Sequence, residues 1–209
     1  MSGPTTTLIL GGARGGKSDW AVDLAQRSGR PVVYVATATP DDAEMAERIA
    51  NHRATRPHSW HTVEAPLDLS AAVTQHSQPG DLVLIDCLTL WVSNVVLRRT
   101  AGEAEPDALP PRLWRDVEAE LLTAAAGVLD SARERDVSLI LVSNEVGMGV
   151  VPPYVLGRGY RDVLGSVNRA VAARADPVAL MVAGLPIDLR RLLVAAHGVL
   201  PPPAAERTP

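Results

Sequence analysis

One stretch near the start of the chain reads TLILGGARGGKS, from Thr7 to Ser18. Its first four residues form a continuous apolar run, which is typical of a strand buried on both faces of a parallel sheet. The glycine-rich segment that follows predicts a tight loop, because glycine adopts backbone conformations that other residues avoid. Residues 17–27 then carry apolar side chains at helical spacing. The stretch therefore predicts a strand, a loop and a helix in immediate succession.

The loop fits the pattern G-x-x-x-x-G-K-[ST] of phosphate-binding loops. In such a loop the backbone N–H groups surround a phosphate, and the positive end of the next helix adds to the attraction. We expect Lys17 to reach the β- and γ-phosphates of a nucleotide and the Ser18 hydroxyl to ligate Mg²⁺. The predicted nucleotide-binding residues of the loop are Gly11, Gly12, Ala13, Arg14, Gly15, Gly16, Lys17 and Ser18.

Similar apolar runs and helical segments alternate along the rest of the chain. The further runs are residues 32–36, 82–85, 139–142 and 178–182, and the helical patterns cover 42–53, 113–134 and 161–174. This alternation predicts an α/β fold of the P-loop NTPase class, a mostly parallel sheet flanked by helices. We expect a single domain over residues 1–195, with surface loops at 100–111 and 147–160. Residues 196–209 are rich in proline and predict a disordered tail.

Composition restricts the function classes. The net charge is −4 and aromatic residues make up 3% of the chain, which argues against a nucleic-acid binder built on a basic surface or stacked bases. The single cysteine, Cys87, excludes an internal disulfide and an all-cysteine zinc site. No apolar run reaches the roughly 18 residues of a membrane span, and no signal peptide is evident. We therefore expect a cytoplasmic protein that neither inserts into membranes nor binds nucleic acid.

Asp86 closes the apolar run of residues 82–85. A second acid often holds the metal in P-loop proteins, and it is presented at the carboxyl end of a strand. We expect that strand beside the P-loop strand, and we assign Asp86 with Ser18 to the metal site. The alternative is an ordinary aspartate in a strand-end turn.

His52 lies in a basic segment. At helical spacing Arg48, His52 and Arg56 fall on one stripe, and Arg53 is adjacent. Guanidinium groups around an imidazole depress its pKa and bind phosphate oxygens, which suits a histidine that attacks phosphorus. A solvated basic helix face with an ordinary surface histidine fits the same pattern.

Four blocks in order resemble the bifunctional enzymes of cobalamin biosynthesis, adenosylcobinamide kinase / adenosylcobinamide-phosphate guanylyltransferase. The resemblance extends from about residue 7 to 185. The blocks are residues 11–18, residues 34–38, residues 45–57 with Trp60 and Glu64, and residues 144–152 with Arg161, Asp162, Val167 and Asn168.

The resemblance assigns roles by position. It implies that His52 takes GMP covalently and that Lys17 acts in catalysis. It also implies a RecA-like fold, a homotrimer, and GTP as nucleotide with ATP as the alternative donor, used with Mg²⁺. The further nucleotide-site positions that it implies are Ala36, Thr37, Ala38, Arg53, Ala54, Thr55, Arg56, Glu64 and Asp86.

The predicted function follows from the resemblance. The enzyme phosphorylates adenosylcobinamide on its aminopropanol hydroxyl and then transfers GMP from GTP through His52, giving adenosylcobinamide-GDP. Gly15 stands where serine is usual in the family, which removes one hydroxyl from the loop. Two alternatives remain open from the sequence: a P-loop kinase for another small alcohol, and a non-enzymatic nucleotide-dependent switch.

Overall fold

The computed structural model describes residues 3–40, 43–54, 56–101 and 109–195. Its centre is one seven-stranded sheet in the order β3-β2-β4-β5-β1-β6-β7. Every neighbouring pair is parallel except β6 and β7, which form an antiparallel hairpin at one edge. The strands are β1 (Thr6–Gly11), β2 (Val32–Ala36), β3 (His61–Glu64), β4 (Leu82–Asp86), β5 (Ser138–Val142), β6 (Val178–Val182) and β7 (Leu185–Asp188).

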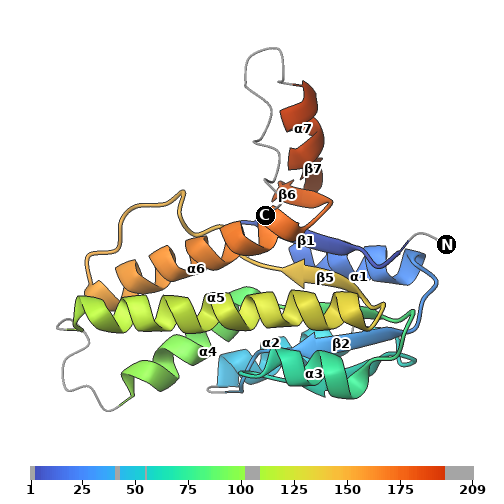
Figure 1. Cartoon of the computed structure of the whole chain (residues 1–209), viewed down its shortest axis with the longest axis horizontal. Coiled ribbons are helices and arrows are strands. Elements are labelled where there is room, and N and C mark those ends of the chain that lie inside the picture. The colour runs from blue at the N-terminus through green and yellow to red at the C-terminus, as the bar shows by residue number, and fades with distance from the viewer. Residues whose placement is uncertain (1–2, 41–42, 55, 102–108, 196–209) are drawn as a thin grey trace, which may run out of the picture.

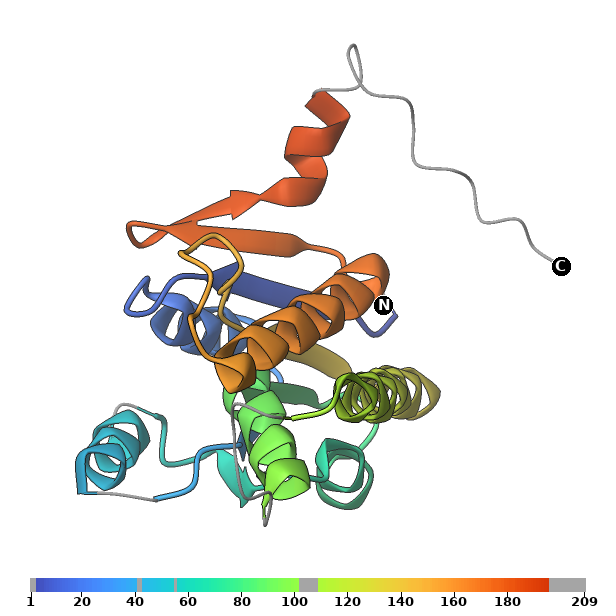
Figure 2. The same cartoon turned by 90° about the vertical axis from the view of Figure 1, so that its left-hand side faces the viewer.

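Helices cover both faces of the sheet, but unequally (Figures 1 and 2). α1 packs on one face, and α3, α4, α5 and α6 pack on the other. α2 stands apart from these helices at the side of the sheet (Figure 2). The helices are α1 (Lys17–Arg27), α2 (Ala43–Ala54), α3 (Leu69–His76), α4 (Leu88–Thr100), α5 (Pro111–Glu134), α6 (Val155–Arg174) and α7 (Leu189–Ala195).

The continuous apolar runs are explained by burial on both sides of the sheet. Side chains of a strand alternate between its faces. Accordingly Leu8 and Leu10 of β1 pack in the larger core cluster with α4 to α6, whereas Ile9 packs with Ala21 and Ala25 of α1. Central strands buried on both sides need apolar residues at every position, as expected of a parallel sheet.

The predicted fold class, a mostly parallel sheet flanked by helices, is confirmed. The five predicted strands and the helices over 17–27, 42–53 and 113–134 are present to within a few residues. The helix predicted over residues 161–174 is present, but its predicted start is wrong. α6 begins at Val155, inside the predicted 147–160 loop. Elements that the sequence patterns did not predict are β3, α3, α4, β7 and α7.

The strand order corrects one further expectation. β4, which ends in Asp86, does not lie beside β1, because β5 pairs with both of them. One strand thus separates the strand before the predicted phosphate loop from the strand of the second acid. The carboxyl ends of all three strands still share one edge of the sheet, since the strands are parallel.

The sequence also led us to expect a disordered C-terminal tail and no membrane span. The predicted tail, residues 196–209, lies outside the described residues. Within the part of the chain that the structure describes, no helix combines the length and apolar character that a membrane crossing requires.

Candidate nucleotide-binding site

The loop between β1 and α1 folds back on itself at the carboxyl edge of the sheet. Gly11 has φ 151°, and a Cβ there would lie 2.8 Å from the carbonyl oxygen of Met181. Gly16 caps α1 in the left-handed region with φ 82°, and Arg14 has φ 56°. Alternating left- and right-handed residues point successive N–H groups into a concavity that binds anions. Gly11 and Gly16 therefore occupy positions that require glycine.

Lys17 is held against this loop. Its ammonium Nζ donates a hydrogen bond of 2.7 Å to the carbonyl of Gly12, and the side chain is buried. Burial lowers the pKa of Lys17, while the neighbouring acidic groups Cys87 and Asp86 act to raise it. Val142 of β5 is in register with Ile9 of β1 and with Asp86 of β4, so the predicted acid lies at the same edge of the sheet as the loop although β5 separates their strands.

The half-buried Asp86 belongs to a cluster of side chains around the buried Tyr34. The Tyr34 hydroxyl donates a hydrogen bond of 2.7 Å to Oδ2 of Asp86. The Arg56 guanidinium lies 3.4 Å from the centre of the Tyr34 ring, and Trp60 stacks on that ring at 6.5 Å. Burial and the neighbouring Asp86 charge raise the pKa of Tyr34, so its hydroxyl remains a donor at all ordinary pH values. The structure thus brings predicted residues Arg56 and Asp86 together through Tyr34.

Tyr34 and Trp60 are residues to which sequence reasoning gave no role of their own. One signal was available for Tyr34. A tyrosine in a strand buried on both faces needs a partner for its hydroxyl, and Asp86 ends a neighbouring strand of the sheet. Trp60 lies in the segment between α2 and β3, and no pattern in the sequence predicted that its ring would contact Tyr34.

The predicted segment, residues 36–38, lies at the same edge of the sheet, but the side chain of Thr37 has a structural role. Its hydroxyl donates to the carbonyl of Cys87 and accepts from the Cys87 N–H, both at 2.8 Å. Its carbonyl accepts a hydrogen bond from Asn94 of α4, and its side chain is fully buried. The Thr37 hydroxyl is therefore engaged by the backbone that follows Asp86, which fixes the end of β4.

Glu64 and Asp86 fall on one row across the sheet. Ala36 of β2 is in register with Glu64 of β3 on one side and with Asp86 of β4 on the other. Glu64 is exposed at the end of an edge strand. The two predicted acids are therefore separated by one strand, at the carboxyl edge where ligands of open α/β sheets bind.

A metal ion would find few protein ligands here. No cluster of three or more histidine, cysteine, aspartate or glutamate side chains suitable for a metal occurs within the described ranges. Ser18, in the first turn of α1, and Asp86 supply a hydroxyl and a carboxylate. Mg²⁺ is commonly held by one or two protein oxygens together with substrate phosphates and water, so this small set suits it.

His52 belongs to the least embedded helix. Its backbone lies within α2, and none of the described side chains of α2 joins either core cluster. The side chains of His52, Arg48 and Ala54, and the whole of Thr55, lie outside what the structure describes. Arg53 is exposed. The chain itself limits the distance from His52 to the anchored Arg56, because four residues span at most about 14 Å.

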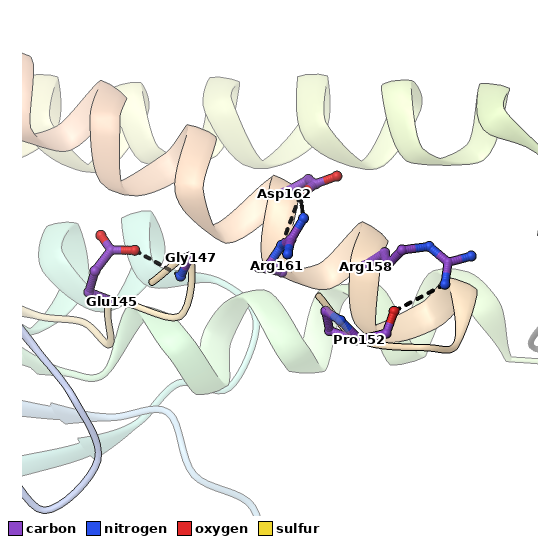
Figure 3. A network of polar contacts seen from close by, with 6 residues as sticks. All are labelled: Glu145, Gly147, Pro152, Arg158, Arg161 and Asp162. Carbon is purple, nitrogen blue, oxygen red and sulfur yellow. Dashed lines mark hydrogen bonds and ion pairs between the residues drawn. The ribbon is translucent and has the colours of Figure 1, made fainter. Parts of the chain in front are cut away.

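The segment after β5 lies against the P-loop. The Glu145 N–H donates to the Gly11 carbonyl at 3.1 Å. Asn168 of α6 holds this segment, accepting from the Ser143 hydroxyl at 2.7 Å and donating to the Asn144 carbonyl at 3.0 Å. Further along, Glu145 accepts from the Gly147 N–H at 3.0 Å (Figure 3). The last of the resembling blocks therefore borders the nucleotide loop.

Comparisons with solved structures find weak likenesses. The chain is similar to the RadB recombinase, with a TM-score of 0.46 and 17% identity over 85% of this chain and 74% of that one. It is also similar to an ATPase of a bacterial type III secretion system, with a TM-score of 0.49 and 13% identity over 94% of this chain and 55% of that one.

Comparisons with sequences are much closer. The chain is 45% identical to the bifunctional adenosylcobalamin biosynthesis protein CobP of Pseudomonas aeruginosa, over 88% of this chain and 96% of that protein. It is 36% and 37% identical to the proteins named CobU of Escherichia coli and Salmonella typhimurium, over 88% of this chain and 98% of each relative. The model of the family described as cobinamide kinase / cobinamide phosphate guanyltransferase matches residues 7–189. That match covers most of the chain and confirms the expected enzyme class, so this protein belongs to the cobinamide kinase / cobinamide phosphate guanyltransferase family.

Proposed function

We propose that this enzyme phosphorylates adenosylcobinamide on its aminopropanol hydroxyl and then converts the product to adenosylcobinamide-GDP. The proposal rests on the family match over residues 7–189, together with the phosphate loop at the edge of the sheet where Asp86 ends β4. We place both reactions in the cytoplasm.

In the first reaction the γ-phosphate of GTP, or alternatively ATP, passes to the acceptor hydroxyl. The loop N–H groups and the Lys17 ammonium stabilise negative charge on the phosphates. Mg²⁺ would be held by Ser18 and Asp86 and would supply positive charge to the phosphate oxygens. Tyr34 orients Asp86 by donating to one of its oxygens, which leaves the other free for the metal or its waters.

In the second reaction His52 is the nucleophile. A neutral imidazole nitrogen attacks the α-phosphorus of GTP, a P–N bond forms, and the P–O bond to pyrophosphate breaks. A phosphate oxygen of the phosphorylated acceptor then attacks the same phosphorus, and the P–N bond breaks as GMP is transferred. Dividing the displacement in this way is the usual advantage of covalent catalysis.

Arginines near His52 would stabilise the charge that develops in these steps. Arg56 is anchored on Tyr34 near Asp86, and this anchor keeps the end of α2 at the carboxyl edge of the sheet. Arg53 is exposed on α2, and Arg48 precedes His52 by one helical turn. None of the described side chains of α2 joins a core cluster, which is compatible with an approach of His52 to bound GTP.

The test is covalent labelling. We expect protein incubated with GTP labelled at the α-phosphate to retain label after denaturation, in a bond that acid cleaves and alkali does not. His52→Ala should abolish the label and the GMP transfer, whereas His58→Ala, which removes an exposed histidine outside α2, should retain both. Label that persists in His52→Ala would place the nucleophile elsewhere.

We also propose a homotrimer. The support in this chain is an apolar surface on the projecting β6–β7 hairpin and α7, where Val182, Leu185 and Leu192 are exposed. Exposed apolar patches of this kind are typical of subunit contacts.

A further inference from the structure

A hollow of about 410 Å³ lies along one face of α6, apart from the phosphate loop. Five of its lining residues belong to α6 and fall at helical spacing, so they share a face. The sixth, Gly147, belongs to the segment after β5 (Figure 3). The lining residues are Gly147, Arg161, Asp162, Gly165, Ser166 and Arg169.

The lining of the hollow has two arginines and one aspartate, and the Glu145 carboxylate accepts from the Gly147 N–H at 3.0 Å. The half-buried Arg161 pairs with its sequence neighbour Asp162 at 3.2 Å, and Asp162 is 69% exposed. Arg169 forms no hydrogen bond or ion pair with any residue in the described ranges, and Ser166 adds a hydroxyl. Exposed ion pairs between neighbours are weak, so Arg161 is readily redirected to a ligand. Two guanidinium groups and a hydroxyl match the oxygens of a phosphate group.

Gly165 keeps the hollow open. It lies between Arg161 and Arg169 on the helix face, and a Cβ added there meets no heavy atom within 4 Å. Packing against the rest of the protein therefore does not require glycine at this position. The lack of a side chain leaves space between the two arginines, which is what a bound group would need.

One side of the hollow is formed by the segment after β5 that contacts the nucleotide loop. Gly147 is two residues from Glu145, whose N–H is bonded to Gly11, and two residues span at most about 7 Å. Asn168, next to Arg169, bonds the start of the same segment and so fixes α6 to the carboxyl edge of the sheet. A phosphate in the hollow would thus lie close to the nucleotide but outside the loop that binds it.

We infer that this hollow binds the phosphate monoester of the phosphorylated acceptor, the substrate of the second reaction; this inference rests on the proposed function. The nucleotide phosphates already have the loop and Lys17, whereas the acceptor phosphate needs cationic partners of its own. The segment that continues from Gly147 carries the exposed apolar side chains of Met148, Val150 and Val151. Apolar surface beside a phosphate site suits an acceptor that joins a large ring to a phosphorylated arm.

The experiment separates the two half-reactions. Labelling of His52 by GTP needs no acceptor, so Arg161→Ala, Arg169→Ala and Gly165→Leu should label like the unaltered protein. Each change should raise the KM for the phosphorylated acceptor about tenfold or more, and the double arginine variant should raise it further. The KM for GTP should not change. Arg161→Lys keeps the positive charge but lacks the forked guanidinium. Its KM for the phosphorylated acceptor should therefore lie between the values of Arg161→Ala and the unaltered protein.

Controls make the outcomes distinct. Arg133→Ala removes an exposed arginine at the far end of α5 and should leave every constant unchanged. An unchanged acceptor KM in the three hollow variants would overturn the inference while the proposed function stands. A raised KM for GTP, or lost labelling, would assign the hollow to the nucleotide and also overturn it. If the unaltered protein labels but transfers no GMP to the acceptor, the proposed function fails and the inference with it.

Discussion

Lys17 is the only lysine in the chain, and it stands in the phosphate loop. Every other basic side chain that binds phosphate here would be an arginine, which stays charged at all working pH values. Lys17 differs because burial lowers its pKa. Burial also raises the pKa of Cys87 to about 11.

A nucleotide should raise the pKa of Lys17, because phosphate oxygens favour the ammonium form. Protein labelled with ¹³C at the lysine ε-carbon should give a single side-chain resonance, whose titration midpoint lies below 10.5 without nucleotide and moves upward with GTP. Nucleotide affinity should accordingly weaken as the pH rises through the midpoint. A midpoint that GTP leaves in place would show that Lys17 does not contact the phosphates.

At the scale of elements, α6 illustrates how packing overrides helix propensity. Gly157 and Gly159 made residues 147–160 look like a loop, since glycine weakens helices. The structure shows helix from Val155, because α6 lies against α5 and a Cβ at Gly159 would overlap the indole ring of Trp114. Glycine at that position permits the close approach of the two helices.

Two glycines of α6 should therefore respond oppositely to alanine. Gly159→Ala forces a Cβ into Trp114 and should lower the free energy of unfolding by about 1–3 kcal/mol, the usual cost of overpacking. Gly165→Ala meets no neighbour and should raise it by about 0.5–1 kcal/mol, as alanine does in helices. Urea denaturation measures both. Equal changes in the two variants would contradict the proposed role of Gly159 in helix contact.

At the scale of the whole molecule, the sheet has two different edges. β3 is the edge strand on one side and consists of exposed and half-buried residues. β7 is the edge strand on the other side and belongs to a projecting hairpin, on which Val182 and Leu185 are exposed. Exposed edge strands and apolar side chains favour association with another chain. The hairpin edge is thus the better candidate for the subunit contact of the proposed trimer.

Replacing an apolar residue of this edge by a charge should dissociate the trimer. We expect sedimentation equilibrium to give three times the chain mass of 22.1 kDa for the unaltered protein and a lower mass for Leu185→Asp. Leu97→Asp changes a similarly exposed leucine on α4, away from the hairpin, and should leave the mass unchanged. A single-chain mass for the unaltered protein, or a trimer that survives Leu185→Asp, would exclude this contact.

The central strands, the phosphate loop and the order of strand and helix could be predicted from the sequence, because they depend on local patterns: continuous apolar runs, and glycines followed by a lysine. β3 and β7 were not predicted because they are short, exposed edge strands. α4 was not predicted because its run of valine and leucine fits strand and helix equally well.

The contacts between residues that are distant in the sequence depend on how the whole chain packs. The tertiary structure placed β5 between β1 and β4, joined Arg56, Tyr34 and Asp86 into one cluster, and set the arginine-lined face of α6 beside the segment after β5. Such contacts depend on strand order and helix packing, which sum many weak long-range interactions that no local pattern records.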